Sequence, residues 1–343
     1  MESSISVFVL FFLCLLLSLI FNYLILKYSK KLNILMDRGN ESKPQRMHFE
    51  DIPRAGGIGI FISIVFAFFY TNNALLILPL IFIFASGILE DLHNSLSPKL
   101  RLFLQVLGAG LAIYIFNCVI TNVGIEIPYY LGVVFSIFCI VGISNSINII
   151  DGFNGLAGGI SLIVLLSIII VSYIVGDSNV FYISLALSGA IVGFLLLNFP
   201  YGKIFLGDGG AYLIGFVIAF LLIKLTQENN VSAWYGLCIM IYPTFEVIFS
   251  IYRKKILRNI PATSPDSIHF HMLLYKRLVK VNYKTSIFIW ILNIPFIFLP
   301  ILFFNNHLML IALSIVFIIL YVFIYFGLIN FKSKKFKSLK KYF

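Results

Sequence analysis

The chain has 343 residues, of which 60% are hydrophobic and only 11% are charged. A soluble domain usually has about 25% charged residues, so this composition excludes an ordinary water-soluble protein. The net charge of +11 would suggest a nucleic-acid partner in a soluble protein, whereas in a membrane protein it reflects topology first. The four cysteines (Cys14, Cys118, Cys139, Cys238) stand singly in apolar runs without metal-ligand spacing, so they are expected to be buried structural thiols.

Apolar runs near or above the roughly 20 residues needed to cross a bilayer recur along the whole chain. They predict an all-α polytopic integral membrane protein with eleven transmembrane helices, or ten, because the second run is short and only 71–73 separates it from the third. The first run lacks a preceding basic stretch and a cleavage site, so it is predicted to be a retained span. The spans are expected near 5–26, 56–70, 74–90, 101–119, 128–149, 155–175, 179–198, 209–227, 231–251, 285–304 and 308–330.

The placement of Lys and Arg predicts the orientation of these spans. With the N-terminus outside, 24 of the 25 basic residues fall in cytoplasmic segments, and only Lys224 lies near the outer face. The outer loops instead carry Glu126, Asp177 and Glu228. The C-terminus is then cytoplasmic, and the basic tail 331–343 is expected to attract anionic membrane lipid. Nucleic acid is not expected as a partner.

Five unusual polar segments fall on the predicted cytoplasmic side. They are 43–61, Glu90-Asp91, 145–161, 202–216 and 264–277. Their grouping on one face predicts a single site at the membrane interface. A transporter would more naturally place its ionisable residues near the bilayer midplane, on broken helices.

Two adjacent acids, Glu90 and Asp91, end the third span on a face that is otherwise rich in basic residues. Neighbouring carboxylates suit a divalent cation, or a general base made more basic by its like-charged neighbour. Lys99 and Arg101 would then bind phosphate oxygens. The alternative interpretation is a solvated helix end.

Asn145, Asn148 and Asp151 recur every three residues, so on a helix they share roughly one face. A polar stripe on an otherwise apolar helix end should line water or a ligand. Asn154 follows in a glycine-rich turn, where its amide is suited to reading the edge of a base. A plain tight turn with close helix packing is the alternative.

Asp208 lies just ahead of a predicted helix start, with glycines on both sides. It is either an N-cap or a metal-binding carboxylate beside a helix N-terminus that favours phosphate. No P-loop sequence occurs. His269 and His271 lack a third zinc ligand nearby, so contact with phosphate or sugar is expected. Glu246 is expected to have a structural role, with support of the site as the alternative.

Five motifs, in this order, resemble those of the polyprenyl-phosphate N-acetylhexosamine-1-phosphate transferases, the WecA/MraY superfamily. The motifs are PRAGGIGI, GILED…LSPKLRLFLQ, NSINIIDGFNGLAGG, KIFLGDGGAYLIGF and HFH, and the resemblance covers roughly residues 43–277. The Pro-Arg-x-Gly-Gly form and the single His-x-His resemble the WecA branch. The three-histidine run typical of the peptidoglycan-precursor branch is missing.

The resemblance implies phosphoryl transfer at the cytoplasmic face of the bacterial inner (plasma) membrane. The phosphate of undecaprenyl phosphate would attack the β-phosphorus of a UDP-N-acetylhexosamine, releasing UMP, with Mg²⁺ (alternatively Mn²⁺) bridging the diphosphate. This would be the first membrane step of a surface polysaccharide of the O-antigen, teichoic acid or capsule type. The alternatives are a phospho-MurNAc-pentapeptide transferase of peptidoglycan synthesis and, in a different class, a flippase for lipid-linked sugars.

The resemblance also implies an organisation and a set of site residues. Residues 1–343 would form one transmembrane catalytic domain that contains a substrate-binding loop, 252–284, and relatives suggest a homodimer. Asp208 would bind the metal with Asn148 as its partner, and Glu90 and Asp91 would act as base for the lipid phosphate or as metal partners. Substrate binding is predicted for Arg54, Lys99, Arg101, Asn145, Asp151, Phe153, Asn154, His269 and His271.

Two positions depart from the family pattern. Glu90 stands where the family usually has Asp, and its extra methylene could move the carboxylate by roughly 1 Å. Asn154 stands where the family usually has Asp, which removes one negative charge from the nucleotide turn. An amide can still donate to and accept from uracil, so nucleotide binding is expected to survive.

Overall fold

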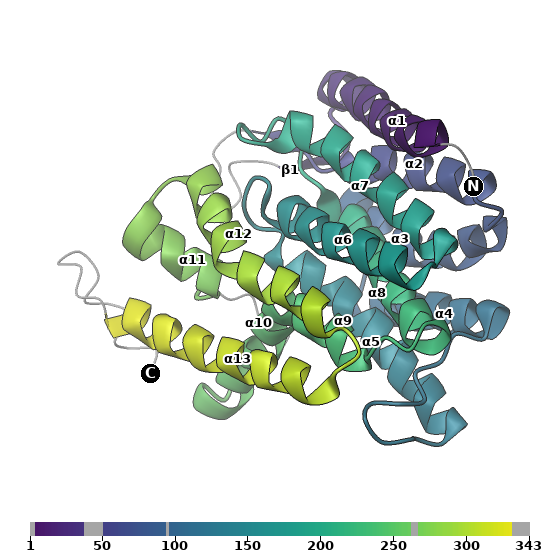
Figure 1. Cartoon of the computed structure of the whole chain (residues 1–343). Helices are drawn as coiled ribbons and strands as arrows, with labels where there is room; N and C mark the ends of the chain where they lie inside the picture. Colours follow the sequence, from purple (N-terminus) through teal and green to yellow (C-terminus); the bar gives the residue numbers. More distant parts are fainter. Residues whose placement is uncertain (1–3, 38–50, 94–95, 262–266, 331–343) are drawn as a thin grey trace.

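The computed structural model describes residues 4–37, 51–93, 96–261 and 267–330, and these form a bundle of helices (Figure 1). Within these ranges the only strands are β1 (Met36–Asp37) and β2 (Ile52–Pro53), an antiparallel pair. The predicted all-α polytopic fold is confirmed. The long helices are α1 (Ser4–Leu32), α2 (Gly56–Tyr70), α3 (Ile77–His93), α4 (Pro98–Phe116), α5 (Tyr129–Ile150), α6 (Leu156–Val175), α7 (Ser178–Asn198), α8 (Gly207–Glu228), α10 (Ile241–Tyr252), α12 (Asn282–Phe298) and α13 (His307–Asn330).

All eleven predicted apolar segments are helical, because a helix satisfies its backbone hydrogen bonds internally when lipid supplies no partner. Among the described residues, nine helices are long and apolar enough to cross a membrane, and ten if a bent pair counts as one span. Helix α2 is shorter, with 15 residues. The outside N-terminus and the cytoplasmic C-terminus stay predictions from the charge distribution.

The predicted ninth span, 231–251, is helical but broken. It consists of α9 (Ala233–Ile239) and α10, which meet at Met240 with a bend of 78°. Pro243 lies in the first turn of α10 and has no N–H, so it cannot bond to the carbonyl of Ile239 and its ring would clash there. The bend gives α10 its own direction, and α10 carries Glu246.

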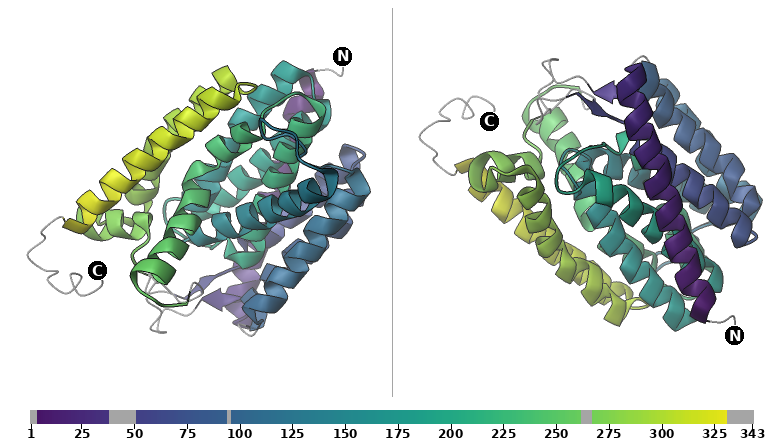
Figure 2. Two further views of the ribbon diagram at one scale, coloured as in Figure 1. Left: turned by 90° about the horizontal axis from the view of Figure 1, so that it is seen from below. Right: turned by 90° about the horizontal axis from the view of Figure 1, so that it is seen from above.

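Helix α8 lies at the centre of the bundle. In its apolar stretch 89% of the residues are buried, and it contacts α2, α3, α5, α6, α7 and α9. Helices α1 and α13 lie on opposite sides of the molecule (Figure 2). Because α8 contacts six other helices, segments that are distant in sequence meet around it.

Glycines allow the ends of α2, α3 and α8 to touch through their backbones. A Cβ atom on Gly87 of α3 would lie 2.2 Å from the backbone nitrogen of Gly209, and one on Gly57 of α2 would lie 2.4 Å from the Cα of Gly210. Side chains at these positions would force the helices apart. The close approach places Asp91 beside the first turn of α8.

The predicted substrate loop 252–284 is largely helical in the part that the structure describes. It contains a turn of π-helix (Arg253–Leu257), α11 (Phe270–Leu274), a second π-helical turn (Tyr275–Val279) and the start of α12. Residues 262–266 of this loop, residues 43–50 of the first polar segment and the basic tail 331–343 lie outside the described residues.

Candidate functional site

Four charged side chains meet at the N-terminal end of α8. Arg54, Asp91, Arg101 and Asp208 form what we call the charged cluster. Nη2 of Arg54 donates to Oδ1 of Asp208 at 2.7 Å and lies 3.3 Å from Oδ1 of Asp91. Nη1 of Arg101 donates to Oδ2 of Asp208 at 3.0 Å. The structure thus brings together four of the predicted site residues, from four different segments of the chain.

Backbone pairing holds Arg54 in the charged cluster. The N–H of Phe205 donates to the carbonyl of Pro53 at 2.8 Å, and the N–H of Gly56 donates to the carbonyl of Phe205 at 2.9 Å. The segment around Arg54 therefore runs beside the residues that lead into α8, and the guanidinium lies next to Asp208. Burial lowers the pKa of Arg54, but the carboxylates of Asp208 and Asp91 outweigh it and raise the pKa above its ordinary value.

Asp91 caps the first turn of α8 from outside that helix. Its Oδ1 accepts from the N–H of Asp208 and its Oδ2 accepts from the N–H of Gly209, both at 3.1 Å. The N-cap residue of α8 itself, Leu206, provides no side-chain cap. A carboxylate at this place satisfies two orphan donors and complements the helix dipole. Asp208 was predicted as a possible N-cap, but Asp91 provides the cap of α8.

Gly207 provides the backbone conformation that starts α8. Its φ of +79° lies in the left-handed region, and a Cβ atom there would lie 2.6 Å from Oδ2 of Asp91. A side chain would therefore be both strained and in collision with the cap. This explains the glycine that immediately precedes Asp208.

Glu90, which was predicted to act with Asp91, points elsewhere. Its Oε2 accepts from the N–H of Leu96 at 2.9 Å, so it braces the connection between α3 and α4. Within the described residues it makes no hydrogen bond or ion pair to the charged cluster. Adjacent residues on a helix face different directions, about 100° apart, and this separates the two acids.

The two predicted basic residues of α4 also differ. Arg101 binds Asp208, whereas Lys99 is exposed and its side chain contacts no partner in the part of the chain that the structure describes. Ser97 caps α4 by accepting from the N–H of Leu100, and Pro98 begins the helix. The capped start fixes which face of α4 carries Arg101 toward α8.

The polar stripe of α5 lies against α4. Nδ2 of Asn145 donates to Oε1 of Gln105 at 2.6 Å, and Gln105 is buried one turn beyond Arg101 on α4. Asn148 is half-buried, and its side chain makes no hydrogen bond within the described ranges. Sequence reasoning missed Gln105, although its spacing of four from Arg101 placed both on one helix face.

The turn between α5 and α6 joins several segments. Nδ2 of Asn154 donates to the carbonyl of Pro200 at 2.9 Å, while the backbone of Asn154 bonds to the side chains of Asn282 and Ser286 in α12. The side-chain amide of Asn154 was predicted to contact a base, but its nitrogen is bonded to the backbone of Pro200. Its Oδ1 is not engaged in any hydrogen bond in the described ranges.

Asp151 lies in the same turn, and its carboxyl interacts electrostatically with three members of the charged cluster, Arg54, Asp208 and Asp91. Its pKa is raised to about 7, mainly because the carboxyl is removed from water. The positive charge of Arg54 lowers the pKa, and the negative charges of Asp208 and Asp91 raise it. A carboxyl with this pKa exchanges its proton readily near neutral pH. Asp151 is therefore able to respond to the charge of a bound ligand.

The predicted histidines pack against this turn and against α10. The ring of Phe153 contacts that of His271, with centroids 5.7 Å apart, and Nδ1 of His269 lies 2.8 Å from Oε1 of Glu246. Tyr321 of α13 donates to the other oxygen of Glu246 at 2.6 Å. Sequence reasoning gave Glu246 a structural role and missed Tyr321, because a tyrosine in an apolar span carries no signal of its partner.

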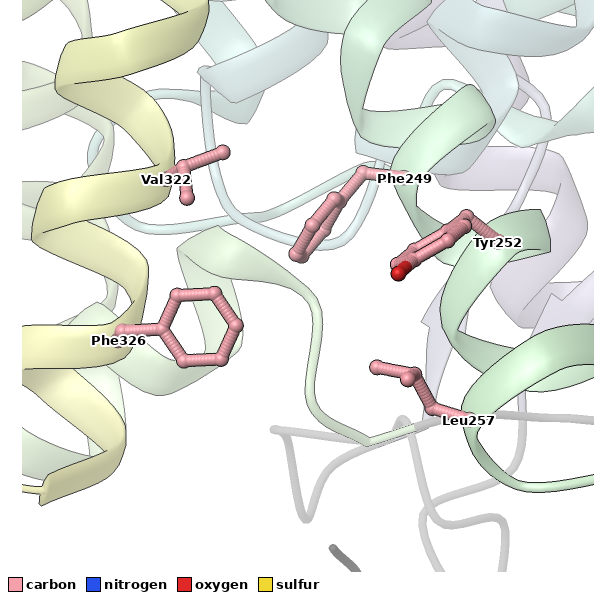
Figure 3. A pocket seen from close by; sticks show the side chains of 5 residues that line it. All are labelled: Phe249, Tyr252, Leu257, Val322 and Phe326. Atoms are coloured by element: carbon pink, nitrogen blue, oxygen red, sulfur yellow. The ribbon is translucent and has the colours of Figure 1, made fainter.

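An apolar pocket opens between α10 and α13, apart from the charged cluster (Figure 3). Its volume is about 540 Å³, and its lining consists of Phe249, Tyr252, Leu257, Val322 and Phe326. This lining provides no charged group for an anionic substrate. The arginines predicted to bind an anionic substrate lie at the charged cluster and do not line this pocket.

Oxygen donors of the type that a magnesium ion uses occur in two predicted metal-binding residues, Asp208 in the charged cluster and Asn148 on α5. Among the described residues, no three His, Cys, Asp or Glu side chains come close enough to form a metal site by themselves. Mg²⁺ commonly uses one or two carboxylates together with water and substrate phosphates. Asp208 at the start of α8 and the free amide oxygen of Asn148 are hard oxygen donors of this kind.

The arrangement defines the class of protein as a membrane-embedded enzyme for anionic substrates. Two arginines, two aspartates and a helix N-terminus lie at one end of an apolar bundle. Such groups bind and polarise phosphate. The comparisons with known proteins agree with this class.

Residues 73–226 match the family described as Glycosyl transferase family 4. A probable undecaprenyl-phosphate N-acetylglucosaminyl 1-phosphate transferase of Bacillus subtilis is 30% identical over 258 residues, which are 71% of each chain. A phospho-N-acetylmuramoyl-pentapeptide-transferase of Streptococcus pneumoniae is 29% identical, over 77% of this chain and 88% of the relative. An undecaprenyl-phosphate alpha-N-acetylglucosaminyl 1-phosphate transferase of Yersinia pestis is 28% identical, over 75% and 74%. The chain belongs to glycosyl transferase family 4 and is an enzyme.

Proposed function

We propose that this enzyme transfers an N-acetylhexosamine 1-phosphate from a UDP-sugar to undecaprenyl phosphate and releases UMP. The observation that carries the proposal is the pair of arginines on Asp208 at the N-terminus of α8. The names of the Bacillus and Yersinia relatives, which are N-acetylglucosaminyl 1-phosphate transferases acting on undecaprenyl phosphate, support the choice of substrates. The product would begin a surface polysaccharide at the cytoplasmic face of the bacterial inner membrane.

The reaction joins two anions, so the main task of the protein is to offset charge and align the reactants. An oxygen of the lipid phosphate attacks the β-phosphorus of the UDP-sugar, and the bond from that phosphorus to the bridging oxygen breaks. The electron pair leaves with UMP. Arg54 and Arg101 lie where they can bind the diphosphate oxygens, and the first turn of α8 adds its partial positive charge.

A magnesium ion would be held by Asp208, with Asn148 as the second protein donor. When bound, it would neutralise charge on the diphosphate and polarise its oxygens. Asp91 holds the backbone at Asp208 and so fixes the direction of that carboxylate. Asp151, with its raised pKa, is placed to take up or give up a proton as the phosphates bind.

The site lies at one end of the apolar bundle, which suits a reaction between a soluble nucleotide sugar and a lipid. Undecaprenyl phosphate can approach in the plane of the membrane while the UDP-sugar approaches from water. This location favours transfer chemistry over transport, because a flippase would need polar groups along a path through the bilayer. A homodimer remains part of the proposal, on the basis of the family resemblance alone.

The experiment is a transfer assay with purified protein. Radiolabelled UDP-GlcNAc, UDP-GalNAc or UDP-MurNAc-pentapeptide is incubated with undecaprenyl phosphate and Mg²⁺, and labelled lipid and UMP are measured. We expect label from one of the two N-acetylhexosamines. Label from only the pentapeptide donor would identify the enzyme as the peptidoglycan-precursor transferase. If no donor labels lipid while a labelled lipid-linked sugar crosses vesicles, the transfer function is wrong.

A further inference from the structure

We propose that Glu246 and Tyr321 are positioning residues that hold His269 with its Nε2 atom directed to the substrate phosphates. The inference rests on the proposed function, and it gives the last span, α13, a part in the site. It assigns different tasks to the two histidines of the His-x-His motif. His269 meets the ligand, and His271 fixes the segment in place.

Glu246 is the centre of a buried hydrogen-bond network. Its side chain is fully buried. Oε1 lies 2.8 Å from Nδ1 of His269, both oxygens accept from the backbone N–H of Phe270, and Oε2 accepts from the hydroxyl of Tyr321 at 2.6 Å. A buried carboxylate with this many donors is fixed in direction, and it fixes its partners in turn.

The network determines which nitrogen of His269 carries a proton. An ionised carboxylate can only accept, so Nδ1 of His269 must be the donor. The side chain of His269 is only 5% exposed, and its Nε2 makes no hydrogen bond within the described ranges of the chain, so this atom keeps its capacity to bond to a ligand that reaches it. A carboxylate bonded to Nδ1 fixes the direction of the imidazole ring, and a ring that carries protons on both nitrogens can donate from Nε2 to a phosphate oxygen.

His271 cannot take the same role. It is completely buried, and burial lowers its pKa to about 3. The negative charge of Glu246 raises this pKa and His269 lowers it, but burial has the largest effect. Its Nδ1 lies 3.3 Å from the hydroxyl of Tyr242, and its Nε2 is directed to the backbone of Gly152, 3.5 Å from where a Cβ would be. His271 therefore stays neutral and packs the segment against the turn after α5.

The packing of His271 places His269 beside the nucleotide turn. The two rings are parallel, with centroids 5.5 Å apart and planes within 2°. Gly152 and Phe153, which contact His271, directly follow Asp151, and Asp151 interacts electrostatically with Arg54 and Asp208. The contacts of His271 with the turn after α5 thus hold the His-x-His segment on the side of the charged cluster. The hydrogen bonds through Glu246 connect the same segment to α13.

The test is a double-mutant cycle with Tyr321→Phe and His269→Ala. Tyr321→Phe removes one hydroxyl and keeps the ring, which contacts Phe245 and Phe270. We expect it to lower kcat/KM for the UDP-sugar by about tenfold, because His269 is held less firmly in the direction that binds the substrate. If Tyr321 acts through His269, the same change in the His269→Ala protein should have almost no further effect.

The matched control is Tyr235→Phe. Tyr235 is also buried, and its hydroxyl also makes one side-chain hydrogen bond, to Ser167 at 2.8 Å, but no hydrogen bond or ring contact among the described residues links it with His269. This variant should lose stability without a change in kcat/KM per folded molecule. Equal effects of Tyr321→Phe and Tyr235→Phe, or independent effects of Tyr321→Phe and His269→Ala, would overturn the inference.

A second measurement does not depend on activity. Long-range ¹H–¹⁵N spectra of histidine-labelled protein report which ring nitrogen carries the proton, and the chain has only five histidines. We expect His269 to be protonated at Nδ1 in the wild type and to lose this preference in Glu246→Gln. A His269 protonated only at Nε2 would contradict the inference even if the transfer activity is established, and inactive wild-type protein would instead contradict the proposed function.

Discussion

Asp91 caps a helix to which it does not belong: its carboxylate accepts from the backbone N–H of Gly209, 118 residues further along the chain. The family resemblance suggests Asp91 as a base or a metal partner. In the structure both of its oxygens are bonded to the start of α8, so its main effect is to hold Asp208 in place.

Replacing Asp91 with asparagine should therefore affect stability and activity together. Asparagine has one acceptor oxygen, and its NH₂ group would face a backbone N–H, so we expect a loss of about 1–3 kcal/mol in the free energy of unfolding. Transfer activity should fall at least about tenfold because Asp208 shifts. Thermal midpoints in detergent and transfer rates measure the two effects.

Asp177→Asn is the control for this prediction. Oδ1 of Asp177 caps α7 by accepting from the N–H of Val180 at 2.9 Å, and its Oδ2 accepts from Nδ2 of Asn229 at 2.8 Å, so an asparagine has too few acceptor oxygens for both donors. Its predicted position is at the outer face. We expect a similar loss of stability with unchanged activity per folded molecule. An Asp91→Asn protein that is as active as Asp177→Asn would show that the cap does not position Asp208.

Glu90 should be replaceable. Glu90→Gln keeps an acceptor oxygen for the N–H of Leu96, and we expect activity within about threefold of the wild type. Glu90→Asp should also be tolerated, with a stability loss below about 1.5 kcal/mol for the single weakened bond. A loss of more than about a hundredfold in the transfer rate of Glu90→Gln would restore this residue as the general base.

The two basic residues of α4 should behave differently. Arg101→Lys keeps the charge but loses the planar fork that reaches Asp208 from α4, so we expect transfer to fall about tenfold. Lys99→Ala removes an exposed charge and should change the rate by less than about threefold. Rates at saturating and limiting UDP-sugar would compare them, and a larger effect of Lys99→Ala would contradict the assignment.

Asp208→Asn should abolish most of the activity and raise the Mg²⁺ concentration needed for the remainder. The change removes a hard oxygen ligand and also leaves Arg54 and Arg101 without their shared carboxylate. A titration of the transfer rate with Mg²⁺ tests this. Near-wild-type turnover at low Mg²⁺ would contradict the role of Asp208 in metal binding.

His271 should make the protein sensitive to acid. Its pKa is about 3 in the folded protein and about 6.5 when unfolded, so the unfolded chain binds a proton at pH values where the folded chain does not. Stability from this group is complete above about pH 6.5 and declines as the pH falls toward 3. His271→Gln should flatten this decline in thermal midpoints, and an equally steep decline would contradict it.

Several features of the site were visible in the sequence because they depend on local spacing. The polar stripe Asn145-Asn148 lies on one face of α5, and the basic residues follow the capped start of α4, as helical periodicity requires. Spacing alone did not show that the two adjacent acids of α3 have different functions. Glu90 and Asp91 are adjacent in sequence, yet one bonds to Leu96 and the other to α8.

The length and polarity of the segments, by themselves, determined a polytopic helical membrane protein, because a helix satisfies its backbone hydrogen bonds internally where lipid supplies no partner. That the polar segments share one face stays a prediction from the charge distribution. The motifs in the sequence also indicated the family. Only the tertiary structure decided that Asp91 caps α8, that Asn154 bonds to Pro200, and that Tyr321 reaches His269 through Glu246. These partners are separated by tens of residues, and the choice between them depends on how closely the glycine-lined helices pack and on where α10 bends.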